Sequence, residues 1–126
     1  PMNFLDCTLE SRDGELRVVH PAFALPVMLA QRTRLEGING GRAMRLAIRP
    51  AEIALVPAQV DGAVRASILV TEPLGGDMLV DCALGDNKVL VKTGPDFAGR
   101  RGEECWLTFN KARWHLFAAD TGIAYF

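Results

Sequence analysis

Cysteine, histidine and serine are scarce in this chain, and their scarcity removes several common catalytic and metal-binding arrangements. The three cysteines, Cys7, Cys82 and Cys105, are odd in number and widely spaced. A secreted domain held by disulfides shows a denser and usually even set, so a reducing cytoplasm is the simpler expectation. None of the cysteines forms a C-x-x-C pair or accompanies a histidine at zinc-ligand spacing. All three fall in strand-like segments, where we expect them to be small buried hydrophobic residues.

The chain also lacks the signatures of nucleophilic catalysis and of phosphate binding. Its only serines, Ser11 and Ser67, lie outside any nucleophile-elbow pattern. His20 and His115 are far apart in the sequence, and a histidine beside a strand end is typically a packed or surface imidazole. Residues 37–42, GINGGR, supply glycines but no lysine followed by a hydroxyl residue, so they do not form a P-loop. We therefore expect no catalytic residue, no metal and no cofactor in this chain.

Long apolar runs and an excess of one charge are missing as well. The formal net charge is −1, which gives no general attraction to nucleic acid or anionic membranes. No run approaches the ~18 apolar residues of a membrane-spanning helix, and no secretory signal is present. The 126 residues suit one domain with a real core. Because the chain starts at Pro1 and enters a strand at once, we expect it to be a piece of a longer protein.

Short alternating segments, in contrast, are abundant. Residues 3–10 place Leu5, Cys7 and Leu9 on one face, and Asp13-Gly14 then suits a type I′ hairpin turn. Similar segments recur with turns about every eight to twelve residues, which predicts an antiparallel barrel or sandwich. The run 62–117 has about the strand count of a small five-stranded barrel. We find no exact internal repeat.

One segment, residues 26–36, has the pattern of a helix. Pro26 suits a first helical position and Gly37 suits a C-terminal cap. Charges are unevenly distributed around it, because five arginines crowd residues 32–49 and four acidic residues crowd residues 72–86. Either a self-complementary surface or an ordinary solvated face would explain this distribution.

Three stretches occur in an order and spacing that resemble one family. They are PMNFLDCTLE at 1–10, LAIRPAEI at 46–53 and GEECWLTFNKARWHLFAADTG at 102–122. They resemble the C-terminal regulatory region of the ATP-binding subunits of sugar-import ABC transporters, of the maltose and glycerol-phosphate type. The motif counterparts are Met2-Asn3-Phe4, Leu46-Ala47-Ile48-Arg49-Pro50, Glu72-Pro73-Leu74-Gly75, and His115-Leu116-Phe117 with Thr121-Gly122. The chain departs from the family at Ala47, where glycine is usual, and at Ala51, where glutamate usually follows Arg-Pro and Glu52 comes one position later.

This resemblance implies a mostly β, OB-type antiparallel barrel of the transport-associated (TOBE) kind with one short helix. It implies a single regulatory domain over 1–126, with the helix at 28–37 and the central barrel strands at 43–126. The chain itself would be no enzyme and hold no cofactor, whereas ATP and magnesium would bind the ATPase domain of the parent chain. The implied partners are a second copy, that upstream ATPase domain, the membrane subunits of the transporter and a regulatory protein, but no nucleic acid. The implied location is the cytoplasmic face of the plasma membrane.

The LAIRPAEI segment has a physical interpretation beside the resemblance. Pro50 removes a backbone donor and ends the strand that carries Leu46 and Ile48 inward. Arg49 is held in extended backbone just before that proline. Its planar guanidinium can bind a carboxylate through two hydrogen bonds, either within its own barrel or in a second copy. Both alternatives stay open at this point.

The function that the resemblance implies is to tether two ATPase subunits and to tune transport. The candidate contacts for a second copy or a regulator are Phe4, Arg49, Glu52, Glu72 and Gly102. An alternative is a small β-barrel that binds an oxyanion or a sugar, for which the arginines would supply charge. A nucleic-acid-binding barrel is disfavoured, because phosphate contacts dominate such binding and the net charge is near zero.

Overall fold

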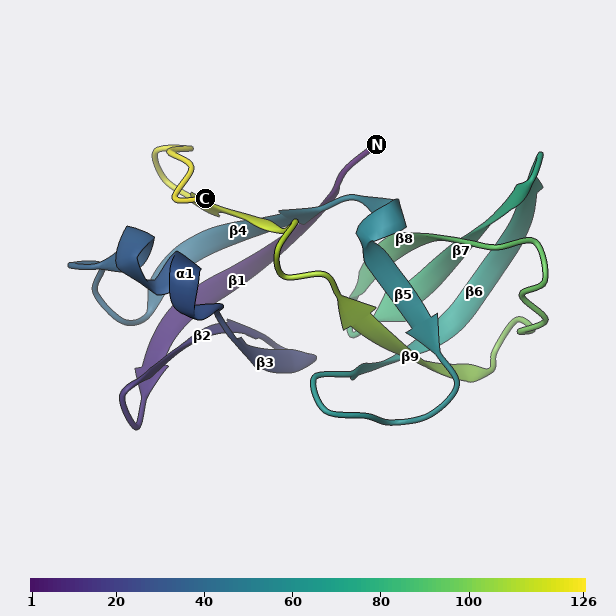
Figure 1. Ribbon diagram of the computed structural model, residues 1–126, viewed down its shortest axis with the longest axis horizontal. Coiled ribbons are helices and arrows are strands. Elements are labelled where there is room, and N and C mark those ends of the chain that lie inside the picture. The colour runs from purple at the N-terminus through teal and green to yellow at the C-terminus, as the bar shows by residue number, and fades with distance from the viewer.

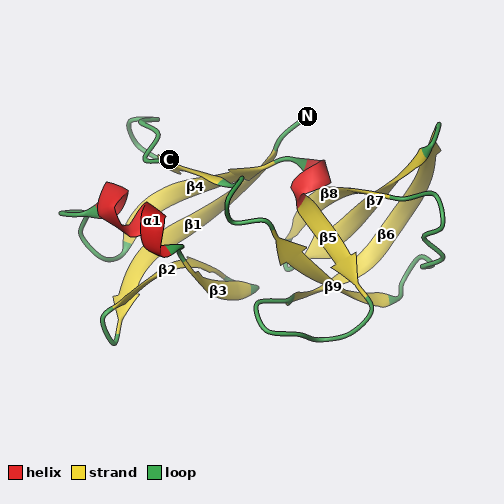
Figure 2. Ribbon diagram, in the orientation of Figure 1, coloured by secondary structure: helices red, strands yellow, loops and turns green.

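The structure is a computed structural model that describes residues 1–126, and it contains two five-stranded antiparallel sheets (Figure 1). The strand order is β10-β4-β1-β2-β3 in the first sheet and β5-β9-β6-β7-β8 in the second. Helical segments occur only at the left-hand end of the molecule and at the junction between the sheets (Figure 2). The prediction of a mostly β, antiparallel fold with one short helix is therefore confirmed.

The first sheet comprises β1 (Asn3–Arg12), β2 (Glu15–His20), β3 (Phe23–Pro26), β4 (Arg42–Ile48) and β10 (His115–Ala118). Alternation along β1 buries Leu5 and Leu9 and leaves Phe4 exposed, as the pattern predicts. β1 joins β2 through a turn with positive φ at both Asp13 (54°) and Gly14 (78°). These angles are those of the predicted type I′ turn, whose twist matches the flanking strands.

The second sheet comprises β5 (Ile53–Val56), β6 (Val64–Leu74), β7 (Asp77–Leu84), β8 (Asn87–Thr93) and β9 (Glu104–Phe109). The β6–β7 register shifts between Ile68 and Val70, so β6 carries a bulge there. The strands of 43–126 do not form one central barrel as expected. β4 pairs with β1 along its whole length and β10 pairs with β4, so both belong to the first sheet.

The two sheets have the same order of strands, and each contains one strand from the other half of the chain. β1 to β4 are arranged in the first sheet as β6 to β9 are in the second, but β5 pairs with β9 and β10 pairs with β4. The registers agree, because Leu55 lies opposite Leu107 and Leu116 lies opposite Leu46. Each half of the chain therefore supplies the last strand of the other half's sheet.

The helical segments are short. α1 (Leu29–Arg32) continues directly into the 3-10 turn η1 (Thr33–Leu35), and a second 3-10 turn, η2 (Pro50–Glu52), joins β4 to β5. The helix expected at 28–37 is therefore present at 29–35, and its second half is a 3-10 turn. Leu35 is the only residue of α1 and η1 that is buried. None of these helical segments has the length and apolar character needed to cross a membrane.

A single cluster of 25 buried residues spans both sheets. Trp114 is the largest of the fully buried side chains, and it lies directly before β10. Its Nε1–H donates to Oε1 of Gln31 on α1 at 3.0 Å, and the backbone N–H of Met28 donates to the same oxygen at 3.1 Å. Gln31 thus ties α1 to the strand that the second half contributes to the first sheet.

Candidate functional site

The junction between the sheets is built from η2 and the turn after β9. Pro50 is buried at the start of η2, and the Glu52 N–H donates to the Arg49 carbonyl at 2.9 Å. Asn110 then contacts Glu52 twice: its backbone N–H donates to the Glu52 carbonyl at 2.9 Å, and its Nδ2 donates to Oε2 at 2.8 Å. Glu52 therefore holds together the two turns from which the exchanged strands depart.

Arg49 does not contribute to that clamp. Its backbone is extended before Pro50, as predicted, with φ −75° and ψ 149°. Its side chain is exposed, and none of the ion pairs within the chain includes it. The alternative in which Arg49 braces its own barrel through a carboxylate is therefore not what the structure shows.

Asn3, which the motif Met2-Asn3-Phe4 contains but which was not among the predicted contacts, makes a second clamp between the sheets. Its Nδ2 donates to the Leu90 carbonyl and its Oδ1 accepts from the Leu90 N–H, both at 2.8 Å. The side-chain amide thus satisfies one backbone position on β8, which is an edge strand of the second sheet. The two residues are 87 positions apart, so no local pattern could reveal the contact.

Replacing Asn3 with alanine is expected to lower the free energy of unfolding by about 1–3 kcal/mol, because it leaves the Leu90 N–H and carbonyl without partners. Urea denaturation followed by circular dichroism measures the loss. Asn39→Ala is the matched control, because Asn39 is exposed. The free energy of unfolding of this variant should stay within about 0.5 kcal/mol of that of the parent chain. Equal losses in both variants would contradict the clamp.

His20 is packed, in agreement with the sequence interpretation. It is 4% exposed and its ring stacks on Phe23 with 4.9 Å between centroids. Its Nδ1 accepts from the Ala22 N–H at 3.0 Å, so Nε2 carries the proton and donates to Asn87 Oδ1 at 2.8 Å. Both ring nitrogens are therefore occupied by structural hydrogen bonds, Nδ1 within the β2–β3 turn and Nε2 from β2 to β8.

The outward side of β1, β4 and β10, hereafter the outer face, carries an unusual apolar surface. Phe4 is 56% exposed on β1, and Phe117 on β10 is only partly buried. Phe4, Arg45 and Phe117 line a shallow hollow of about 190 Å³. Beside it, Arg45 Nε lies 3.5 Å from Asp6 Oδ1 in an exposed ion pair. An apolar patch with a charged rim is typical of a protein interaction surface.

The five predicted contact residues do not form one site. The β1–β4 register pairs Asn3 with Ile48, so Phe4 and Arg49 lie at the same end of the first sheet, near Glu52. Glu72 is exposed on β6, opposite Leu79, near the turn of the β6–β7 hairpin. Gly102, with φ 88°, lies in the loop after β8, where its N–H donates to the Ile68 carbonyl at 2.8 Å.

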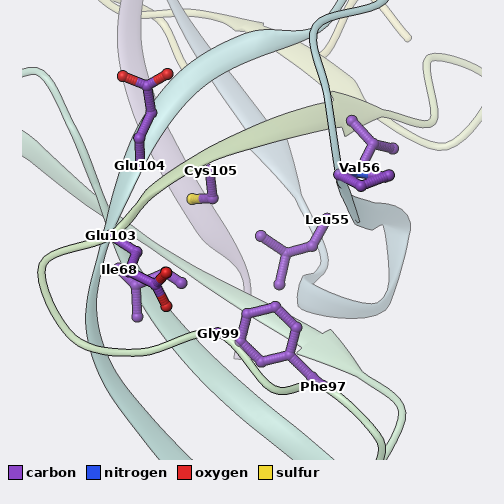
Figure 3. Close-up of a pocket in the computed structure, with 9 residues that line it drawn as sticks. Leu55, Val56, Ile68, Phe97, Gly99, Glu103, Glu104 and Cys105 are labelled. Atoms are coloured by element: carbon purple, nitrogen blue, oxygen red, sulfur yellow. The ribbon is translucent and has the colours of Figure 1, made fainter.

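A cavity of about 380 Å³ opens between β5, β6, β9 and that same loop (Figure 3). Its wall is mainly apolar, and its charged side chains, Glu103 and Glu104, are both acidic. Gly99 lies so close to the Phe97 ring that a Cβ there would overlap it. Cys105 forms part of the cavity wall, whereas the sequence pattern predicts only that it is a buried core residue.

The three cysteines differ in their surroundings. Burial raises the pKa of Cys7 to about 12. The hydrogen bond that Cys82 and Cys105 share lowers the pKa of Cys105, against the opposing effect of burial. The same hydrogen bond raises the pKa of Cys82, and burial raises it further. Cys105 is therefore the thiol of this pair that ionises first.

Comparisons with known proteins agree with the resemblance. The model of the TOBE domain family matches residues 46–117. The chain is 33% identical over 121 residues to the sn-glycerol-3-phosphate import ATP-binding protein UgpC of Salmonella typhi, covering 96% of this chain and 32% of that protein. It is 28% identical over 124 residues to the ABC transporter ATP-binding protein y4oS of Sinorhizobium fredii, covering 96% of this chain and 30% of that protein. The chain thus spans about a third of the length of these curated relatives.

A solved structure of the cytoplasmic molybdate-binding protein ModG, with molybdate bound, has a similar fold. The TM-score is 0.70 at 12% sequence identity, and the match covers 90% of this chain and 94% of that one. At this level of identity the likeness concerns the fold alone. It agrees with the predicted OB-type architecture of the transport-associated kind.

Proposed function

This chain belongs to the TOBE domain family, and from that membership we propose that it is the regulatory and dimerisation domain of the ATP-binding subunit of a sugar-import ABC transporter. The similarity to glycerol-phosphate and other ABC ATP-binding proteins over 96% of the chain supports the placement. ATP and magnesium would bind the ATPase domain of the parent chain. The transporter's membrane subunits and a regulatory protein would be further partners, at the cytoplasmic face of the plasma membrane.

The observation that carries the dimerisation proposal is the outer face of the first sheet. Phe4 lies exposed toward one end of this face and lines the hollow there together with Arg45 and Phe117. Across a two-fold axis, the Phe4 ring of one copy would enter the hollow of the other. Arg45 and Asp6 form an ion pair within one chain. In a two-fold contact each copy presents the same surface, so Arg45 of one copy could also face Asp6 of the other. Arg49, exposed at the end of the same sheet, would be free to pair with a carboxylate of that copy.

Tethering of this kind would raise the effective concentration of one ATPase domain near the other, and it would let a regulator act by binding one arrangement of the two copies more tightly. Two ATPase domains joined at one end meet at a high effective concentration at the other, even while they open and close. A regulator that contacts both copies would favour whichever arrangement it binds more tightly. Neither step needs a catalytic residue in this chain.

Replacing Phe4 with glutamate is expected to weaken self-association at least about tenfold, because it puts a charge at the apolar centre of a symmetric contact. Sedimentation equilibrium over a wide range of protein concentration measures the dissociation constant. Val70→Glu is the matched control, since Val70 is 51% exposed on the second sheet and should leave association unchanged. A parent chain that stays monomeric at every concentration, or equal losses in the two variants, would overturn the proposal.

The second candidate function is binding of a small oxyanion, and the fold likeness to molybdate-bound ModG is the observation that favours it. The best-suited hollow, of about 450 Å³, includes Gln31, Arg34 and His115 and no acidic side chain. Calorimetric titration with molybdate separates the two functions. Saturable binding of one anion per chain, abolished in Arg34→Gln, would support the ligand-binding alternative.

A further inference from the structure

Two buried thiols meet inside the second sheet. Cys82 lies on β7 and Cys105 on β9, the two strands that flank β6. Cys82 is 0% and Cys105 is 8% exposed, and their Sγ atoms are 4.0 Å apart. Both cysteines are free. On the strand between them, Cys105 lies opposite Ala66 and Cys82 lies opposite Ile68.

The spacing of this pair suits a bridging atom better than a disulfide. Strands that flank a common neighbour are about 9–10 Å apart in a sheet, whereas a disulfide needs Cα atoms within roughly 7 Å. Closing the bond would therefore require the backbone to move. Two thiolates that share one metal ion, with metal–sulfur bonds of about 2.3 Å, can be up to about 4.6 Å apart. The observed 4.0 Å between the hydrogen-bonded thiols is shorter than that limit, so the two side chains would rotate slightly apart to reach the near-linear arrangement of two sulfurs about one ion.

A metal ion has a route to these sulfurs. Cys105 forms part of the wall of the 380 Å³ cavity, whose other walls include Leu55, Ile68 and Phe97 (Figure 3). Glu103 and Glu104 lie at the same cavity, so its charge attracts cations. An ion entering from solvent would reach Cys105 first and Cys82 behind it.

The ligand set selects the kind of ion. No third histidine, cysteine or acidic side chain joins the pair, so the four ligands of a structural zinc site are missing. Two sulfur ligands without oxygen donors favour a soft ion that accepts low coordination. We propose that Cys82 and Cys105 form a two-sulfur binding site for a soft monovalent metal ion of the copper(I) class. On binding, each thiol releases one proton to solvent, two metal–sulfur bonds form, and no electron is transferred.

The test is an anaerobic titration of the reduced chain with copper(I) in competition with a coloured copper(I) chelator. We expect the chain to withdraw one equivalent of copper(I) from the chelator. Cys82→Ala and Cys105→Ala should each lose this equivalent. Cys7→Ala should retain it, because Cys7 is equally buried but lies on the first sheet. No uptake by the parent chain, uptake that survives Cys82→Ala, or uptake lost in Cys7→Ala would overturn the proposal.

Two measurements on the parent chain do not depend on the folding of the variants. X-ray absorption at the copper edge should show two sulfur neighbours, and oxygen, nitrogen or a third sulfur in the first shell would contradict the site. Alkylation with iodoacetamide, mapped by mass spectrometry, should slow at Cys105 when copper(I) is present and stay unchanged at Cys7. Because the site lies within one chain, Phe4→Glu should bind copper(I) as the parent does, which separates this result from the dimerisation test.

Discussion

Replacing Trp114 with alanine is expected to lower the free energy of unfolding by about 3–5 kcal/mol, a large share of the stability of a domain this size. The indole is 1% exposed, so its removal leaves a cavity where the exchanged strand β10 begins. The change also removes the Nε1–H that donates to Gln31, so α1 loses one of its two bonds to the segment before that strand and keeps the one from Gln31 Nε2 to the Lys111 carbonyl. Urea denaturation followed by circular dichroism gives the difference in stability.

The second tryptophan provides the matched control for this prediction. Trp106 lies on β9 with its side chain half-buried, opposite Val56 in the β5–β9 ladder. Trp106→Ala removes the same atoms from a site that water already reaches, so its loss should be well under half that of Trp114→Ala. If the two variants are equally destabilised, Trp114 is not the anchor of the exchanged strand.

Much of the fold follows from local sequence patterns. Alternation along β1 predicts which side chains are buried, and it also predicts that Phe4 faces outward on the same strand. Asp13-Gly14 predicts its turn, because type I′ geometry needs positive φ at both positions. These predictions succeed because each depends only on neighbouring residues and on the two-residue period of a strand.

The exchange of strands could not be predicted in the same way. Periodicity states which face of a strand is buried but not which strand it pairs with, and consecutive strands are most often neighbours. β5 and β10 have leucines, Leu55 and Leu116, that occupy equivalent positions opposite the leucines of β9 and β4. Either strand would therefore satisfy the pattern in either sheet.

The same limit applies to the candidate site. The resemblance drew attention to the segments that contain Asn3 and Glu52, but their partners are 87 and 58 residues away, at Leu90 and Asn110. The sequence allowed Arg49 to pair with a carboxylate either in its own barrel or in a second copy. In the structure its side chain is exposed to solvent. Charge and residue type indicate which residues can form such contacts, whereas the folded chain decides which of them do.

The exchange itself leads to a prediction with an all-or-none outcome. Residues 57–62, between β5 and β6, are exposed, so the chain can be divided there into residues 1–59 and 60–126. Each half then carries a strand that belongs to the other half's sheet and lacks the strand that completes its own. We expect neither half to fold alone, and we expect an equimolar mixture to regain the circular dichroism spectrum of the intact chain.

Trp114 reports directly on this reassembly, because it belongs to residues 60–126 but bonds to Gln31 of residues 1–59. Its fluorescence should move to shorter wavelength only when both halves are present, as the indole leaves water. Residues 60–112, which lack Trp114 and β10, serve as the matched control and should fail to restore the first sheet. If they restore it as well as residues 60–126 do, β10 is dispensable and the exchange is not what joins the two sheets. If only the longer partner succeeds, the two sheets are held together by reciprocal strand donation, and the clamps at Asn3 and Glu52 then reinforce a connection that the topology already makes.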